Sequence, residues 1–417
     1  MLRSVGTLIK IAYRNIWRSR RRSFFCLAAV GLAVFFLVFY GSFQDGQING
    51  IETVVKIFNT GHVKVVSERY DEDYEQMPVQ YPVSNGENVA ALVNTVKTIP
   101  GVQAVLPRIE AYATLQDSVL KNATLWGLNI EDELKINHFN MTDRSSGLTE
   151  GRFPEPLSNE CAVGYIFSEK TGLTIGDRIP LKTVSAQFSD RYWSPVITGI
   201  YNFDYLKYDE RVIIVDFQRL QQLLVLGGGT QQLVIYTDEK NSAGIASKAE
   251  ELLGKGNAVQ EWQDNIYVAM IRTNRLQYWL IFTVFIVVAC LLIINTVVMI
   301  INERIKEIGM MGSLGMTRTE IVIVFFFESV LMSAIGAFIG VLLGGIVTGI
   351  LQHYPLRIRD MVGNSMSDFP MSNVIILSFS VLSLVRAWFA GVFVASVFTL
   401  IPSLKCAFVE PVEALRR

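Results

Sequence analysis

The chain has 417 residues, of which 51% are hydrophobic and 18% are charged. It is too apolar for one ordinary soluble domain and too polar to lie wholly in lipid, so we expect a membrane part and a water-soluble part. Its 37 basic and 38 acidic residues nearly cancel, which argues against nucleic acid as a partner. The four cysteines and three histidines show no metal-ligand spacing, so no metal site is expected.

Four apolar runs are long enough to cross a membrane as helices. We place the four transmembrane helices at residues 24–43, 272–301, 321–351 and 382–404. The first run is preceded by several arginines, which is typical of a flank that stays in the cytoplasm. A removed signal peptide is the alternative for this run, but its apolar length exceeds the roughly 7–15 residues of a signal core.

The basic segments at the two ends of the chain set its orientation. Residues 1–23 and 405–417 are predicted to be cytoplasmic, and the segment 302–320 then lies on the same side. Residues 44–271 and the loop 352–381 are expected on the outer side of the membrane.

The outer segment 44–271 predicts an α+β fold, because strand-like and helix-like segments alternate irregularly in it. The strand-like segments are 62–66, 102–115, 123–128, 177–184, 211–217 and 231–236. The helix-like segments are 87–99, 161–172, 217–226 and 242–254. Cys161 is the only cysteine of the outer segment, which excludes an internal disulfide there.

Signals for catalysis are weak in this sequence. The triple glycine at 227–229 lacks the Lys-Ser or Lys-Thr that follows a phosphate-binding loop, and a plain loop is expected there. His62 and His138 lie in the outer segment, but the nucleophile signature Gly-x-Ser-x-Gly is absent from the sequence. We therefore predict a non-catalytic protein.

The segment 302–320 reads NERIKEIGMMGSLGMTRTE and joins two membrane-length runs. Apolar residues recur at spacings of three and four, at Ile301, Ile305, Ile308 and Met311. This spacing predicts an amphipathic helix, and Thr317 with Glu320 forms a capping-box pattern that predicts a new helix. On pattern alone, the segment either docks on a partner or is a turn that rests on lipid headgroups.

Two further features lie within the predicted spans. Gly336, Gly340 and Gly344 form two successive Gly-xxx-Gly steps, which predict close packing with another helix. Glu328 is costly in a membrane unless it is paired. It marks either a functional site or a structural bond to a neighbour such as Asn295.

Several stretches resemble one known family. Residues 302–316 are similar to the coupling-helix signature of the MacB/FtsX-like superfamily of ATP-binding-cassette (ABC) permeases, and residues 402–416 resemble the closing motif of that family. Other pieces agree in order along the chain, at 14–18, 61–65, 99–102 and 172–179. Among the branches, the lipoprotein-releasing permeases of the LolC/LolE type look most similar. One departure is Gly312-Ser313, where the family usually has Arg-Ala.

The resemblance implies a fold and a set of partners. The fold is an α-helical membrane protein with four transmembrane helices and a large extracytoplasmic α+β domain between helices 1 and 2. That domain would contain a split α/β lobe at 44–115 and 212–270, with an inserted β-rich lobe at 116–211. A separate LolD-like ATPase dimer would bind ATP and Mg, so this chain itself would hold no cofactor.

The implied setting is the bacterial inner membrane, where the chain would be a multi-pass protein. Its further partners would be a second permease chain, identical or related, a lipoprotein substrate, membrane lipids and a possible LolA-like periplasmic carrier. Whether the two permease chains are identical is left open.

The resemblance also implies site residues. The ATPase-coupling residues would be Glu303, Glu307, Ile308, Met311, Leu314 and Met316. The residues that could face substrate acyl chains are Phe35, Phe36, Phe39 and Phe43, although lipid-facing residues have the same pattern. A carrier-binding hairpin is expected at 182–193, where an ordinary surface hairpin is the alternative. Its residues are Gln187, Phe188, Arg191, Tyr192 and Trp193.

The function implied is a permease subunit that extracts lipoproteins from the inner membrane by mechanotransmission. One alternative is a MacB-like export permease for peptides, drugs or toxins. Another is an FtsX-like signalling module that activates a cell-wall hydrolase, although the large outer segment argues against it.

Overall fold

The computed structural model describes residues 20–72, 77–116, 119–143, 145–303, 316–354 and 377–406, with short pieces at 6, 10, 12–14, 310–311, 313, 356–357 and 374–375. The chain divides into two compact units. The helical unit comprises Met1–Gln47, Asn274–Pro355 and Ile376–Arg417. The sheet unit comprises Ile48–Thr273 and Leu356–Ile375.

The long helices are α2 (Arg20–Val54), α10 (Ile266–Glu303), α12 (Arg318–His353) and α14 (Val381–Cys406). Within the described residues, three helical stretches are long and apolar enough to span a membrane, namely Ser23–Thr60, Arg318–His353 and Val381–Leu400. The second predicted span falls in α10, where a shorter apolar stretch covers Trp279–Val288. The number of four spans therefore stays a prediction.

The predicted capping box at the start of α12 is confirmed. The Thr317 side chain accepts a hydrogen bond from the Glu320 N–H at 3.3 Å, and the Thr317 N–H donates to the Glu320 carboxylate at 2.9 Å. These two bonds satisfy backbone donors that a helix N-terminus leaves free.

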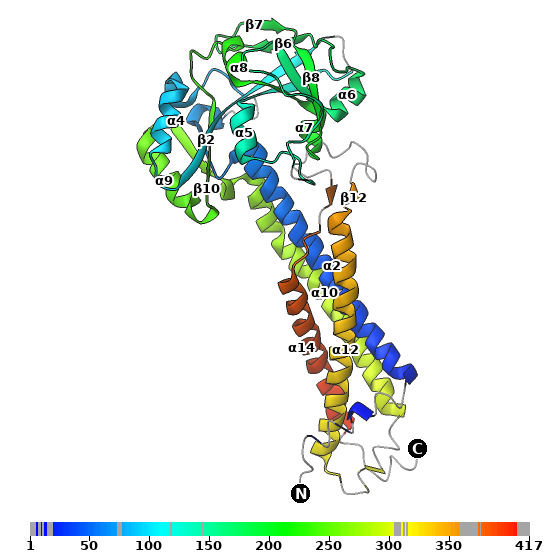
Figure 1. Ribbon diagram of the computed structural model, residues 1–417. Helices are drawn as coiled ribbons and strands as arrows, with labels where there is room; N and C mark the ends of the chain where they lie inside the picture. The colour runs from blue at the N-terminus through cyan, green and yellow to red at the C-terminus, as the bar shows by residue number, and fades with distance from the viewer. Residues whose placement is uncertain are drawn as a thin grey trace. The chain divides into compact units, whose positions relative to one another are not determined.

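Helix α2 approaches α12 at a row of glycines. A Cβ atom added at Gly340 would lie 2.3 Å from the carbonyl oxygen of Gly31, and one at Gly344 would lie 2.9 Å from the Cβ of Val38. Only glycine allows two helix backbones to come this close. Around this contact, Val34 packs with residues of α12 and α14, and Figure 1 shows these last two helices side by side.

The sheet unit is built on a mixed sheet with eleven strands in the described residues. The strand order is β11-β1-β10-β2-β3-β9-β5-β8-β4, and β6 pairs with β2 and β7. The strands are β1 (Val63–Ser67), β2 (Val102–Leu115), β3 (Asn122–Leu128), β4 (Leu148–Gly151), β5 (Glu160–Gly164), β6 (Leu181–Val184), β7 (Asp190–Trp193), β8 (Val196–Tyr201), β9 (Val212–Asp216), β10 (Gln232–Thr237) and β11 (Asn257–Glu261). The pairs β3–β9 and β5–β8 are parallel, and the other strand pairs are antiparallel.

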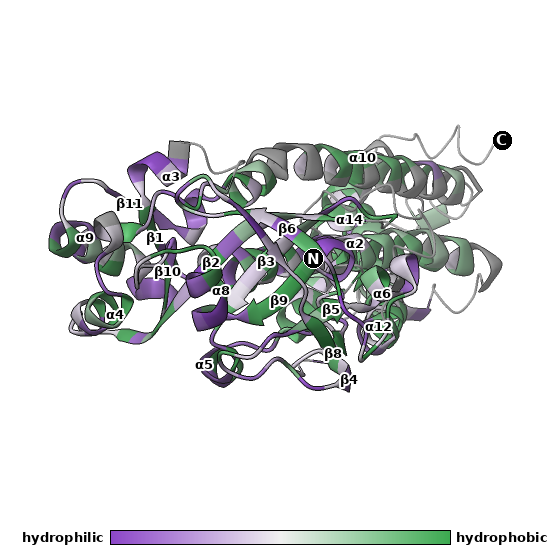
Figure 2. Ribbon diagram, turned by 90° about the horizontal axis from the view of Figure 1, so that it is seen from above, coloured by the Kyte–Doolittle hydropathy of each residue, from purple (hydrophilic) through white to green (hydrophobic). Residues whose placement is uncertain are grey.

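Helices pack on the sheet through their apolar faces. α4 (Val89–Lys97) and α9 (Ser242–Leu253) pack on β1 and β10, whereas α6 (Tyr165–Thr171) and α8 (Phe217–Leu223) pack with β3, β5 and β9. Figure 1 shows these two helix pairs at different parts of the sheet. In Figure 2 the buried strand β9 is coloured hydrophobic, while α8 carries hydrophilic turns.

Shorter elements complete the sheet unit. They are α3 (Glu68–Glu72), α5 (Ile130–Ile136), α7 (Leu206–Arg211), the π-helix η1 (Val55–Thr60), the 3₁₀ turns η3 (Val83–Gly86), η4 (Glu239–Asn241) and η5 (Trp262–Asp264), and the strand pair β12 (Leu356–Arg357) with β13 (Val374–Ile375). The pair β12–β13 lies within the loop predicted at 352–381.

One predicted helix is partly wrong. The segment 161–172 was expected to be helical, but its first residues belong to strand β5 and the helix begins at Tyr165. Cys161, Ala162 and Val163 are fully buried between β8 and β9, so pairing within the sheet overrides the local helical pattern. Burial also raises the pKa of the Cys161 thiol, which keeps this cysteine protonated at neutral pH.

The division into two lobes stays a prediction. The long strand β2 pairs with β10 through its first half and with β6 through its end, so one sheet continues through both predicted lobes. β9 lies in the segment assigned to the first lobe, yet it pairs with β3 and β5 of the segment assigned to the insertion.

His62, at the start of β1, should make the sheet unit sensitive to acid. Its Nδ1 atom accepts a hydrogen bond from the Thr237 N–H at 3.3 Å. Burial lowers the pKa of His62, Lys56 lowers it further, and Glu239 and Asp238 only partly oppose this. The unfolded chain then binds a proton more readily than the folded chain. The stability that neutral His62 contributes is therefore fully present above about pH 6.5 and is lost as the pH falls below that value.

We expect the thermal unfolding temperature of the sheet unit to fall between about pH 7.5 and about pH 5.5, and His62→Gln to flatten this dependence. His138 is exposed, so His138→Gln is the matched control and should leave the pH profile unchanged. A His62→Gln profile identical to the parent would show that another group is responsible.

Candidate functional site

The coupling residues are described only in part. Glu303 is the last residue of α10, whereas Glu307, Ile308 and Leu314 lie outside the described residues. Met311 and Met316 are half-buried against the apolar cluster of the helical unit, and the Met316 N–H donates to the Met311 carbonyl at 3.1 Å. Docking of this segment on an ATPase stays a prediction.

The four phenylalanines of α2 differ in exposure. Phe36 is exposed, while Phe35, Phe39 and Phe43 are half-buried. The rings of Phe35 and Phe39 stack with centroids 6.2 Å apart. The substrate role stays a prediction. Elsewhere in the helical unit, Glu328 is buried and Asn295 is exposed.

The predicted hairpin forms from β6 and β7, which pair antiparallel. Its turn exposes Gln187 and Phe188, the latter at 76%, and Tyr192 on β7 is 66% exposed. Trp193 is buried in the core, where its indole N–H donates to Asn159, and Arg191 is half-buried. Trp193 therefore anchors the hairpin in the core, while Phe188 and Tyr192 present aromatic rings on its surface.

A pocket of about 760 Å³ lies within the sheet unit, lined by strands β1, β2 and β3, the C-terminal end of α2 and the N-terminal end of α10. Side chains alternate along a strand, so residues two positions apart share one face. The lining side chains from the three strands are Lys64, Glu110, Tyr112, Thr124 and Trp126. Their neighbours Val63, Ile109 and Leu125 pack in the apolar cores instead.

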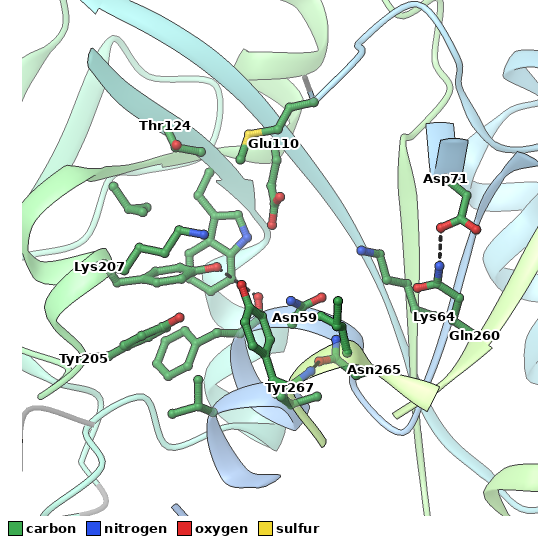
Figure 3. Close-up of a pocket in the computed structure, with 18 of the residues that line it drawn as sticks. Asn59, Lys64, Asp71, Glu110, Thr124, Tyr205, Lys207, Gln260, Asn265 and Tyr267 are labelled. Atoms are coloured by element: carbon green, nitrogen blue, oxygen red, sulfur yellow. Dashed lines mark hydrogen bonds between the residues drawn. The ribbon is translucent and has the colours of Figure 1, made fainter. Parts of the chain in front are cut away.

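The pocket carries charges of both signs. Figure 3 shows Lys64, Glu110 and Tyr267 directed toward the same hollow, with Lys207 on its other side. Asp71 also lines the pocket and accepts a hydrogen bond from the Gln260 side chain.

Lys64 is buried to an unusual degree for a lysine, at 8% exposure. Burial lowers its pKa, and the carboxylates of Glu110 and Asp71 partly offset this effect. In the part of the chain that the structure describes, its ammonium has no hydrogen bond or salt bridge, and the ring of Tyr70 lies 5.9 Å away.

The sequence predictions did not identify this pocket. Its one local signal is a lysine in the middle of the strand-like run HVKVV, where the neighbouring valines are all buried. A charged residue in such a run indicates either a satisfied ion pair or a site. Tyr205, Tyr208 and Tyr267 give no such signal, because only the fold brings them to the pocket.

The chain combines membrane-length helices that pack through glycines with a large mixed-sheet unit. In the sequence, this unit lies between the first two long helices. Residues 279–411 match the family described as FtsX-like permease C-terminal. This part of the chain is an FtsX-like permease domain, and the chain is homologous to the ABC permeases LolC and MacB. Permeases of this family work with ABC ATPase partners.

Two relatives show how far the similarity extends. The lipoprotein-releasing system transmembrane protein LolC of Xylella fastidiosa (strain Temecula1) is 20% identical over 80% of this chain and 82% of its own length. The macrolide export ATP-binding/permease protein MacB of Mannheimia succiniciproducens is 28% identical over 30% of this chain, but over only 17% of its own length. A solved structure, the periplasmic region of MacB from Actinobacillus actinomycetemcomitans, aligns with 53% of this chain and 95% of its own chain at 9% identity and a TM-score of 0.34.

Proposed function

We propose that this chain is the permease subunit of an ATP-driven complex that extracts lipoproteins from the bacterial inner membrane and passes them to a periplasmic carrier. The observation that supports this role is the extent of the LolC alignment, which covers four fifths of both chains. The MacB alignment is limited to less than a third of this chain. The ATP would be hydrolysed by a separate ATPase dimer beneath the segment 302–320.

Helix α10 gives the proposal a mechanical element. It is one helix from Ile266 to Glu303, which at 1.5 Å per residue is roughly 57 Å long. This length exceeds the roughly 30 Å of a bilayer core. A stroke of the ATPase at the Glu303 end would therefore be carried to the sheet unit through continuous hydrogen-bonded backbone.

Reconstitution tests this function. The chain, its ATPase and any second permease chain are placed in liposomes with a fluorescent triacylated lipoprotein, and release is followed with a soluble carrier present. ATP-dependent transfer to the carrier is the expected result. Release that requires an outer-membrane duct would instead identify an export permease, and activation of a cell-wall hydrolase without lipoprotein transfer would identify a signalling module.

The β6–β7 hairpin is the part of the sheet unit that we assign to the carrier. Exposed aromatic side chains supply much of the binding free energy at protein interfaces. Replacing both Phe188 and Tyr192 by serine should weaken carrier binding at least about tenfold, measured by surface plasmon resonance. The thermal stability should not change, because both side chains are exposed.

Leu252→Ser is the matched control for the hairpin variant, because Leu252 is an exposed apolar residue on α9. This control should leave carrier binding intact. Equal loss of binding in the hairpin variant and in the control would contradict the assignment, as would full binding in both.

A further inference from the structure

The pocket of the sheet unit contains buried polar groups that the transport cycle described above does not use. Lys64 projects into it, although only 8% of its surface is exposed. Trp126 lines the same pocket and is completely buried, yet its indole N–H has no acceptor among the described residues. Leaving a buried donor without a partner is unfavourable, and such groups are commonly satisfied by a ligand or a bound water.

An acceptor stands beside these two donors. The half-buried Glu110 carboxylate points into the hollow and forms no hydrogen bond or salt bridge within the described part of the chain. Two further carboxylates line the pocket, of which Asp71 already accepts from Gln260 and Asp264 is exposed. The half-buried Lys207 adds a second ammonium. The hollow thus presents donors for an anion and, separately, a free acceptor for a cation.

We propose that this pocket binds a small zwitterion, with its anionic group held by Lys64 and the Trp126 N–H and its ammonium group held by Glu110. A simple anion would satisfy the donors but would be repelled by Glu110, and a simple cation would be repelled by Lys64. A ligand with both charges satisfies all three groups. This inference does not depend on which cargo the permease moves.

The walls of the pocket suit a ligand with a short carbon skeleton. The rings of Tyr205 and Tyr208 stack with centroids 5.1 Å apart, and the ring of Phe58 lies 4.7 Å from that of Tyr208. These three residues and Trp126 line the pocket. Such aromatic surfaces pack against methylene groups, while the charged groups fix the orientation of the ligand.

The pocket is placed so that a bound ligand would affect the ends of two long helices. Val54 at the C-terminal end of α2, Val55 at the start of η1, and Ile266 and Tyr267 at the start of α10 line the same pocket as the sheet residues. A bound ligand would contact both helix ends and the sheet at once. Binding would therefore stabilise one arrangement of the two helix ends over others.

Two sources supply zwitterions of this size, namely free α-amino acids and the phosphoethanolamine headgroup of a lipid. Isothermal titration calorimetry on the full-length chain in detergent, with the twenty amino acids and phosphoethanolamine as probes, distinguishes them. We expect at least one probe to bind. Acetate, phosphate and ethylamine should bind the chain at least about tenfold more weakly than that probe, because each carries charge of only one sign. A preference for phosphoethanolamine points to the headgroup, and a preference for an amino acid points to the free metabolite.

Lys64→Met and Glu110→Gln should each weaken binding of the preferred zwitterion at least about tenfold. Lys207→Met, at a half-buried position, should weaken this binding less. Lys135→Met is the matched control, because Lys135 is an exposed lysine paired with Glu131 outside the pocket. Thermal unfolding of each variant verifies that it is folded. The proposal would be overturned if none of the probes bound to the folded parent. It would also be overturned if a probe with charge of only one sign bound as tightly as the best zwitterion.

Discussion

The Arg108→Met variant is expected to lose about 3–5 kcal/mol of unfolding free energy, because it leaves a buried carboxylate without its partner. Arg108 is 0% exposed and Glu133 is 1% exposed. The Arg108 Nε and Nη2 atoms donate to the two carboxylate oxygens of Glu133 at 2.6 and 2.9 Å. Such a two-pronged contact is strong in the interior, and removing one side exposes the full cost of burying the other.

The surrounding groups cannot replace the guanidinium. Asn137 already donates to Glu133 at 2.7 Å, and the Tyr236 hydroxyl accepts from Arg108 at 2.9 Å. In the double variant Arg108→Met/Glu133→Leu the charge is removed as well, so most of the stability should return. Urea denaturation of the chain in detergent, followed by tryptophan fluorescence, measures both variants.

Lys135→Met is the control for this experiment, since Lys135 forms an exposed ion pair on the same helix as Glu133 and should matter little. The idea would be wrong if Arg108→Met unfolded at the same urea concentration as Lys135→Met. It would also be wrong if the double variant were less stable than the single one.

Gly340→Ala is expected to destabilise the helical unit by about 1–3 kcal/mol and to reduce transport sharply. The added Cβ would lie 2.3 Å from the Gly31 carbonyl oxygen and 3.0 Å from the Val34 Cβ. The obstacle is backbone, which cannot rotate away as a flexible side chain could. Helices α2 and α12 would therefore have to separate.

Gly349→Ala provides a matched control on the same helix. A Cβ at Gly349 would lie 4.0 Å from the Phe379 ring, which is ordinary van der Waals contact. Unfolding of the reconstituted protein by titration with dodecyl sulfate should place Gly340→Ala well below the parent and Gly349→Ala beside it. Equal midpoints for the two variants would mean that α2 and α12 tolerate the added methyl group, contrary to the geometry of this contact.

The sequence predicted the locally determined elements better than the element that depends on distant partners. Strands 102–115 and 123–128 and helices 87–99 and 242–254 lie within a residue or two of the structure, because their apolar periodicity is strong and turn residues flank them. The capping box at Thr317 was equally local and was predicted correctly. Strand β5 was not, since its burial depends on β8 and β9, which lie 30 to 50 residues further along the chain.

The pocket could not have been derived from the sequence for the same reason. Lys64 and Glu110 lie on distant strands that the sheet order β1-β10-β2 brings to one face, and Tyr267 comes from the start of α10. By contrast, the exposed aromatic residues of the hairpin were predictable, because a short polar turn with aromatic neighbours is a local pattern.

The sheet order also determines when the sheet can be completed during translation. β1 ends at Ser67, but its two neighbours are β10 and β11, and the latter ends at Glu261. β10 is made first and ends at Thr237. At about 5–20 residues per second, translation leaves both edges of β1 unpaired for roughly 9–34 s, until β10 is made, and its second edge unpaired for roughly 10–40 s, until β11 is made. During this interval the nascent chain carries an unpaired strand with four residues that are buried in the folded protein. A chaperone bound to that strand would protect it from aggregation.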